Sequence, residues 1–199
     1  MKHEIWCPLA EMKKERLWYA IVTRDRHGKV ISRERRKSYS FLKAWNQLVY
    51  VAVKYEGVGI SIKDTGGTPR TVILNLYNFR MAAAAGLTDY GIRVGTGNTA
   101  VALDDYALGT PIAEGTEAGE MEHLVCTVAT YVVAAPSCSF LVSRAIVNNS
   151  GDEITVREAA IYMIIGDYYS CATRDVFTTP QAVPIGGAIT VDWTIGVTV

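Results

Sequence analysis

A glycine-rich segment near the middle of the chain comes closest to a chemical motif. Gly95, Gly97 and Ala100 have the spacing G-x-G-x-x-A. In dinucleotide-binding folds this spacing turns a strand into a helix whose N-terminal N–H groups bind a pyrophosphate. Here Gly109 and Pro111 would stop such a helix after about ten residues, and it would carry no basic side chain. We therefore interpret Gly95 and Gly97 as structural turn residues, in backbone conformations closed to other residues.

Acidic side chains follow the glycines. Asp104 and Asp105 are adjacent, so in an extended segment they point in different directions and make a poor acid–base pair. With Glu114 and Glu117 of the next loop they offer oxygen ligands of the kind that calcium prefers. No ligand spacing defines such a site, and a solvated acidic face is the stronger interpretation. We predict no metal site and leave calcium binding by the loop open.

The remaining residues show no motif that is typical of a catalytic nucleophile or a metal site. The chain has no G-x-S-x-G, and Lys63 and Asp64 precede a glycine turn that is typical of a hairpin. The histidines stand apart in sequence, at His3, His27 and His123. The cysteines form no C-x-x-C or zinc spacing, and we expect them to be small buried side chains in a protein made in a reducing cytosol: Cys7, Cys126, Cys138 and Cys171. We predict no catalytic residue and no cofactor.

Two segments carry a family resemblance. Residues 90–112 read YGIRVGTGNTAVALDDYALGTPI. Residues 154–195 combine an I-x-E-x-(A/G)-(I/L)-Y strand with an RD-V…P…V…G closing pattern. Both resemble strand-and-turn units in structural proteins of tailed bacterial and archaeal viruses. The matching positions of the second segment are Glu158, Ile161, Tyr162, Arg174, Asp175, Val176, Pro180, Val183, Gly186, Gly187, Ile189, Val191, Trp193 and Ile195.

The resemblance covers roughly residues 58–199. It implies a β-rich virion protein that is made in the host cytoplasm. Because the shared pattern consists of strands and turns, it indicates fold and setting more strongly than activity.

The elements that position these residues are predicted to be mainly strands. A basic hairpin spans residues 17–36, and Gly186 with Gly187 forms the turn before the last strand. Short strands separated by turn residues favour a β-sandwich or jelly-roll-like fold. The other expected strands are 58–63, 71–77, 90–94, 124–134, 139–148, 154–165, 168–173 and 188–199.

One prominent helix is predicted at about residues 38–56. Ser38 or Ser40 would cap it, and Gly57 would end it. Its apolar residues recur at helical spacing and predict a packing face: Phe41, Leu42, Trp45, Leu48, Val49, Ala52 and Val53.

The 199 residues are expected to form a single domain. Within it, residues 1–57 would be a basic hairpin-plus-helix portion, and residues 58–199 would be the β-rich core. No apolar run of 18 or more residues occurs, and charges interrupt the apolar stretches of the N-terminus. We therefore expect neither a membrane span nor a clean signal peptide.

Charge is distributed unevenly along the chain. Residues 1–80 contain 16 Lys+Arg and 7 Asp+Glu, whereas residues 81–199 contain 4 and 13. Such a split suggests contact with an acidic partner, unless folding interleaves the two halves and cancels the field. The acidic partner would be nucleic acid, a membrane or the acidic half of a neighbouring copy. We predict an assembly interface of Lys29, Arg33, Arg35, Arg36, Lys37, Asp104, Asp105, Glu114 and Glu117.

These observations predict a non-enzymatic virion structural protein that self-assembles or coats the particle. Its partners would be itself and other virion proteins, with no small-molecule substrate. A capsid decoration or minor capsid role is slightly favoured over a tail role, because no shaft-like repeat is visible. The alternative is a carbohydrate- or receptor-binding β-sandwich that stacks ligands on Trp18, Tyr168, Tyr169 or Trp193. A lesser alternative is nucleic-acid binding through the basic hairpin.

Overall fold

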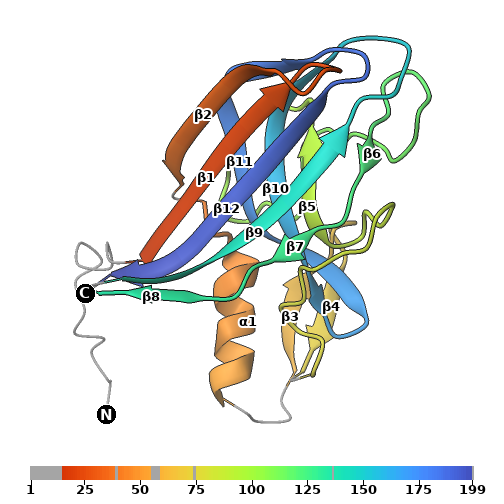
Figure 1. Cartoon of the computed structure of the whole chain (residues 1–199). Helices are drawn as coiled ribbons and strands as arrows, with labels where there is room; N and C mark the ends of the chain where they lie inside the picture. Colours follow the sequence, from red (N-terminus) through yellow and green to blue (C-terminus); the bar gives the residue numbers. More distant parts are fainter. Residues whose placement is uncertain (1–14, 39, 55–58, 74, 136, 199) are drawn as a thin grey trace.

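The described residues form a β-sandwich with one helix and a small hairpin at one end (Figure 1). The mainly β prediction is therefore confirmed. The computed structural model describes residues 15–38, 40–54, 59–73, 75–135 and 137–198.

The larger sheet has seven strands, all paired antiparallel. β1 lies between β2 and β12, so the N-terminal hairpin shares a sheet with the last strand of the chain. The order is β2 (Val30–Ser38), β1 (Glu15–Arg24), β12 (Ala188–Thr198), β9 (Ser137–Val147) and β6 (Glu122–His123), and β7 (Thr127–Val128) and β8 (Val132–Ala134) also pair with β9.

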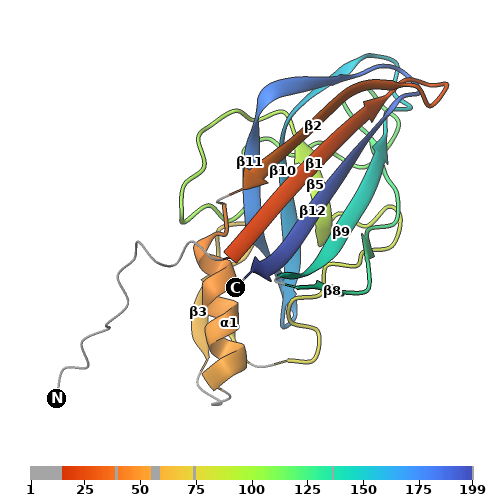
Figure 2. The same ribbon diagram turned by 60° about the vertical axis from the view of Figure 1, so that its left-hand side comes forward.

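The second sheet has three strands among the described residues, and Figure 2 shows β11, β10 and β5 behind the larger sheet. Its order is β11 (Tyr168–Val183), β10 (Ile154–Ile165) and β5 (Gly91–Gly95). The central strand, β10, is buried on both faces from Glu158 to Met163. The core lies between the sheets, where the fully buried Trp193 packs near Tyr19 with ring centroids 6.2 Å apart.

The helix is shorter than predicted. α1 spans Lys43–Lys54, and Ser38 is instead the last residue of β2. The predicted serine caps are wrong because the Ser40 hydroxyl donates to the Asp175 carboxylate, 2.6 Å away, rather than accepting from the helix. The first turn starts after Leu42, whose carbonyl accepts a hydrogen bond from the Trp45 N–H. The predicted terminator, Gly57, lies outside the described residues.

Two predicted strand regions are shorter or interrupted in the structure. The hairpin next to α1 consists of β3 (Ile60–Lys63) and β4 (Pro69–Val72), and the Asn75 side chain then accepts the Tyr77 N–H in a turn. The predicted strand 124–134 is divided into β6, β7 and β8. The chain leaves the β9 ladder at Cys126, whose N–H donates to the Ala83 carbonyl at 2.8 Å.

Other local predictions agree with the structure. The basic strand β2 is an edge strand of the larger sheet. Gly186 has a φ of 71° in the turn between β11 and β12. At Gly187 an added Cβ would lie 2.5 Å from the Arg24 carbonyl oxygen, so this turn requires a residue without a side chain. Asp64 forms the β3–β4 turn by accepting hydrogen bonds from the Gly66 and Thr68 N–H groups.

Candidate functional site

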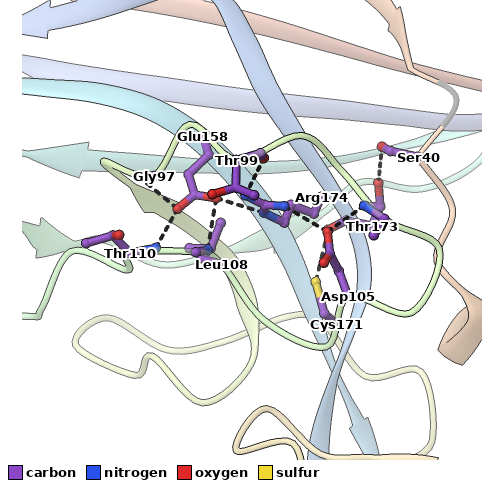
Figure 3. Close-up of polar contacts among 12 residues, drawn as sticks. Ser40, Gly97, Thr99, Asp105, Leu108, Thr110, Glu158, Cys171, Thr173 and Arg174 are labelled. Carbon is purple, nitrogen blue, oxygen red and sulfur yellow. Dashed lines mark hydrogen bonds and ion pairs between the residues drawn. The ribbon is translucent and has the colours of Figure 1, made fainter.

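The glycine-rich segment surrounds a carboxylate of the protein itself. Glu158 on β10 is fully buried, and its oxygens accept the N–H groups of Gly97, Gly109 and Thr110 at 3.1, 3.1 and 2.8 Å. Arg174 on β11 donates to the same carboxylate from Nε at 2.8 Å (Figure 3). The N–H donors of the loop are therefore directed at an internal anion. A pyrophosphate would have to displace Glu158, which rules against the dinucleotide interpretation.

Arg174 extends this network to the rest of the loop. Its side chain is 2% exposed, and Nη1 pairs with the Asp105 carboxylate at 2.7 Å while Nη2 donates to the Thr99 carbonyl at 3.0 Å. A second anchor is the buried Tyr162 hydroxyl, which accepts the Leu108 N–H at 2.8 Å. The loop between β5 and Thr110 is thus held at several points on the second sheet. We call Glu158, Arg174 and Asp105 the buried ion network.

The glycines are structural, but the predicted reason is wrong. Neither Gly95 nor Gly97 is among the residues with a positive φ. An added Cβ at Gly97 would lie 2.4 Å from Glu158 Oε1, and one at Gly95 would lie 2.5 Å from the Thr110 carbonyl oxygen. These positions need glycine because the loop passes so close to the carboxylate that it binds.

Asp175, the residue after Arg174, also forms hydrogen bonds inside the protein. Its carboxylate accepts hydrogen bonds from the Ser38 and Ser40 hydroxyls, both at 2.6 Å. Burial raises the pKa of Asp175, and these hydroxyls oppose the shift. The contact joins the end of β2 to β11 just before α1 begins. The matching residues Glu158, Arg174 and Asp175 therefore hold the fold together.

A polar cleft lies between α1, the β3–β4 hairpin and the loop. Its volume is about 270 Å³, and it is lined by both acidic and basic groups, including Lys43, Lys63, Asp104 and Asp105. The Lys63 ammonium lies 5.5 Å from the centre of the Tyr106 ring. No histidine or cysteine lines the cleft. Its chemistry is that of a charged binding surface without an activated nucleophile.

The predicted acidic ligands are not brought together. Asp104 and Asp105 line the cleft, whereas Glu114 and Glu117 lie in the loop before β6. Glu114 accepts hydrogen bonds from the backbone N–H and the ring Nδ1 of His123, both at 2.8 Å. Within the part of the chain that the structure describes, no group of three or more His, Cys, Asp or Glu residues is placed to hold a metal ion.

The other predicted interface residues lie on β2 or, for Lys29, directly before it, at the opposite edge of the larger sheet from β6. Arg33 and Arg35 are exposed, and the Arg35 guanidinium lies 5.3 Å from the centre of the Trp18 ring. Arg36 forms an ion pair with Glu34. The nine predicted residues therefore occupy three places: the β2 edge, the polar cleft and the loop before β6.

The four aromatic residues considered for ligand stacking are engaged elsewhere. Trp193 is fully buried, and Trp18 lies under Arg35. Tyr169 stacks on Tyr90 at 6.0 Å, and the Tyr168 ring lies 4.2 Å from the Arg70 guanidinium. These side chains do not form a shared stacking platform.

Sequence analysis missed one buried polar cluster. Arg144 on β9 is 1% exposed and donates to the carbonyls of Ala84, Leu87, Ile92 and Leu124 at 2.7–3.2 Å. Its neighbour His123 is also 1% exposed. The only available signal was a lone arginine in the apolar strand 139–148, which is not specific. The hydrogen bonds of Arg144 hold residues 84–92 against β9.

No family model, curated protein or solved structure matches this chain. Among the described residues, no helix is long and apolar enough to span a membrane. The buried ion network lies next to the polar cleft, because Asp105 belongs to both.

The close approach of the loop to Glu158 predicts that Gly97→Ala destabilises the protein. The new methyl group would push the carboxylate away from its donors, at a cost of roughly 1–3 kcal/mol in the free energy of unfolding. Gly151→Ala is the matched control, since a Cβ there meets nothing within 4 Å. Urea unfolding measures both variants. Equal stabilities would contradict the steric account.

Removing the charge of Glu158 should lower the free energy of unfolding more than Gly97→Ala does. Glu158→Gln leaves Arg174 with Asp105 as its remaining counterion and turns an amide group toward three N–H donors. We expect a loss of roughly 3–5 kcal/mol, as is typical when one partner of a buried pair is removed. The exposed Glu153→Gln is the control. If chemical denaturation gave both variants wild-type stability, the network would not stabilise the fold.

The lowered pKa of the buried His123 predicts that the protein loses stability in mild acid. Burial, aided by the positive charges of Arg144 and Arg93, lowers its pKa from 6.5 to about 4, against the opposing effect of Glu114. As pH falls from about 6.5 to 4, the unfolded chain gains a proton that the folded chain does not bind. Stability should therefore fall by up to roughly 3 kcal/mol over this window.

The measurement compares unfolding free energies at several pH values. The difference between the unfolding free energies at pH 7 and pH 4.5 should be smaller in His123→Gln, because this variant has no imidazole to protonate at position 123. His27→Gln, at an exposed position, is the control. An unchanged pH profile in His123→Gln would show that other groups cause the acid sensitivity.

Proposed function

We propose that this chain is a virion structural subunit that assembles with copies of itself, the basic edge of one copy binding the acidic edge of the next. The observation that carries the proposal is the position of the two charged segments. Residues 29–37, mostly β2, contain five Lys/Arg and one Glu, whereas residues 113–122 contain four Glu and no Lys or Arg. β2 and β6 lie at opposite edges of one sheet, and the acidic segment forms the loop that leads into β6.

The separation of the edges preserves their opposite charges. Four strand spacings separate β2 from β6, or about 19 Å. Exposed charges are screened over roughly 8–10 Å at physiological ionic strength. The edges of one molecule therefore neutralise each other little, and each is available to an oppositely charged edge of another copy.

This contact would be heterologous, because it joins two different surfaces. Repeated contacts of this kind close into a ring or continue as a filament. Both geometries suit a protein that coats or extends a particle. The virion setting is supported by the family-like segments 90–112 and 154–195, whose shared residues Glu158, Arg174 and Asp175 stabilise the fold rather than act on a ligand.

Nucleic acid is the main competitor for the basic edge. Phosphate contacts from exposed arginines would give salt-sensitive binding without any need for the acidic loop. The self-assembly proposal differs because it requires both edges. Experiments that change each edge separately and then combine them distinguish the two functions.

The charge-reversal variant Arg33→Glu/Arg35→Glu should remain folded and lose self-association. Lys43→Glu/Lys63→Glu is the matched control, since it changes the net charge equally but lies at the polar cleft. Sedimentation and native mass spectrometry should give oligomers for the wild type and the control. Raising the salt concentration to 1 M should weaken the wild-type oligomers, because screening shortens to about 3 Å.

The reciprocal variant Glu117→Lys/Glu122→Lys should also be monomeric. Mixing it with Arg33→Glu/Arg35→Glu should restore association in mixed oligomers, because the unchanged basic edge of the glutamate variant can bind the unchanged acidic edge of the arginine variant. A wild type that stays monomeric at high concentration would refute the proposal. Duplex DNA binding that is lost only in the arginine variant, with no change in oligomeric state, would move the function to nucleic-acid binding.

A further inference from the structure

An apolar groove separates α1 from the end of the larger sheet. Two cavities, of about 510 and 250 Å³, meet at Trp45 and Phe140. The larger one continues toward Val128 of β7, and the smaller one toward Val197 of β12. Figure 1 shows α1, the start of β1 and the end of β12 at this same end of the molecule.

The wall formed by α1 is an ordered aromatic cluster. Phe41 stacks on Trp45 with ring centroids 4.7 Å apart, and Phe79 contacts Trp45 edge-on at 5.2 Å. Apolar side chains along the groove are open to solvent, with Val49, Val128 and Val197 exposed by 38, 45 and 55%. Apolar surface of this kind gains free energy when another apolar group covers it.

The start of the described chain lies at this groove. Glu15 pairs with Val197, and Val197 pairs on its other side with Cys138, which also lines the groove. Glu15 and Cys138 are therefore two strand spacings apart, or about 10 Å. Residues 1–14 lie outside the described part, and they contain the apolar run Ile5-Trp6-Cys7-Pro8-Leu9.

We propose that residues 5–9 of the same chain bind in this groove. Cys7 lies eight positions before Glu15, a reach of up to about 27 Å when extended, so the run can span the distance to Cys138. Tethering also gives the segment an effective concentration near the millimolar range, which favours it over a segment of another copy. Pro8 lacks an N–H donor, so contact through side chains suits the run better than pairing as a central strand.

This inference goes beyond the proposed function and does not depend on it. The groove lies at the α1 end of the sandwich, whereas the assembly contacts lie along the two edges of the larger sheet. A monomeric protein would fill the groove in the same way.

Two native cysteines provide the test. Cys138 is half-buried in the groove, whereas Cys126 and Cys171 are 1 and 0% exposed. Mild oxidation of the dilute full-length protein with copper-phenanthroline should give an intramolecular Cys7–Cys138 disulfide, identified by non-reducing gel and peptide mass spectrometry. Disulfide formation requires the two Cα atoms to come within about 7 Å.

Tether length alone is tested by Cys138→Ser/Arg35→Cys, which places an exposed thiol on β2 within the same reach. The native pair should form at least roughly tenfold faster than this control pair. Val49→Lys should slow the native reaction by placing a charge in the groove. Tyr50→Lys, the next residue on α1 and not a groove residue, should leave the rate unchanged.

Three outcomes would overturn the proposal. The first is a native disulfide that forms no faster than the control pair. The second is a rate that does not respond to Val49→Lys. The third is a disulfide that is exclusively intermolecular, which would assign the groove to a second copy of the chain.

Discussion

The structure depends on the burial of one carboxylate, that of Glu158. Removing such a charge from water costs several kcal/mol, and the cost is offset only if its oxygens receive good hydrogen bonds. Three backbone N–H groups of the glycine-rich loop and the Arg174 guanidinium supply them. The loop must therefore lie directly against the carboxylate, and this requirement excludes a side chain at Gly97.

The same burial positions the surface around it. Arg174 also forms an ion pair with Asp105, and this pair fixes the position of a residue that lines the polar cleft. Leu103, two residues earlier, accepts the Lys43 N–H at 3.0 Å and so connects the loop to the first turn of α1. The Leu42 N–H donates to the Ala172 carbonyl on β11, and this contact fixes the start of the helix from the other side. Helix, cleft and loop are thus held by one connected set of contacts.

Local patterns predicted the parts of this fold that depend on local physics. Apolar patterns and turn residues predicted the basic hairpin and the strands 154–165 and 188–199, since each is a continuous segment next to its own turn. Tertiary hydrogen bonds decided the rest. The hydroxyl of Ser40 fits a helix cap in sequence but bonds to Asp175, and the strand after Leu124 breaks because Cys126 pairs with Ala83. The buried ion network joins Arg174 to Asp105 across 69 positions of the sequence, and no local periodicity contains such partners.

The hydrogen bonds of Glu158, Arg174 and Asp175 give the segments 90–112 and 154–195 a structural role. Glu158, Arg174 and Asp175 form hydrogen bonds inside the protein, so their contacts hold neighbouring segments on the second sheet and indicate no ligand. Function then depends on what the sandwich presents outward. Its outward features are spatially separate: opposite charges at two edges of one sheet, and an apolar groove at the α1 end. Opposite edges suit repeated contact between copies, whereas a groove beside the first strand suits a segment of the same chain. Under the self-assembly proposal, copies would meet through the charged edges, and a groove filled by the same chain would take no part in that contact.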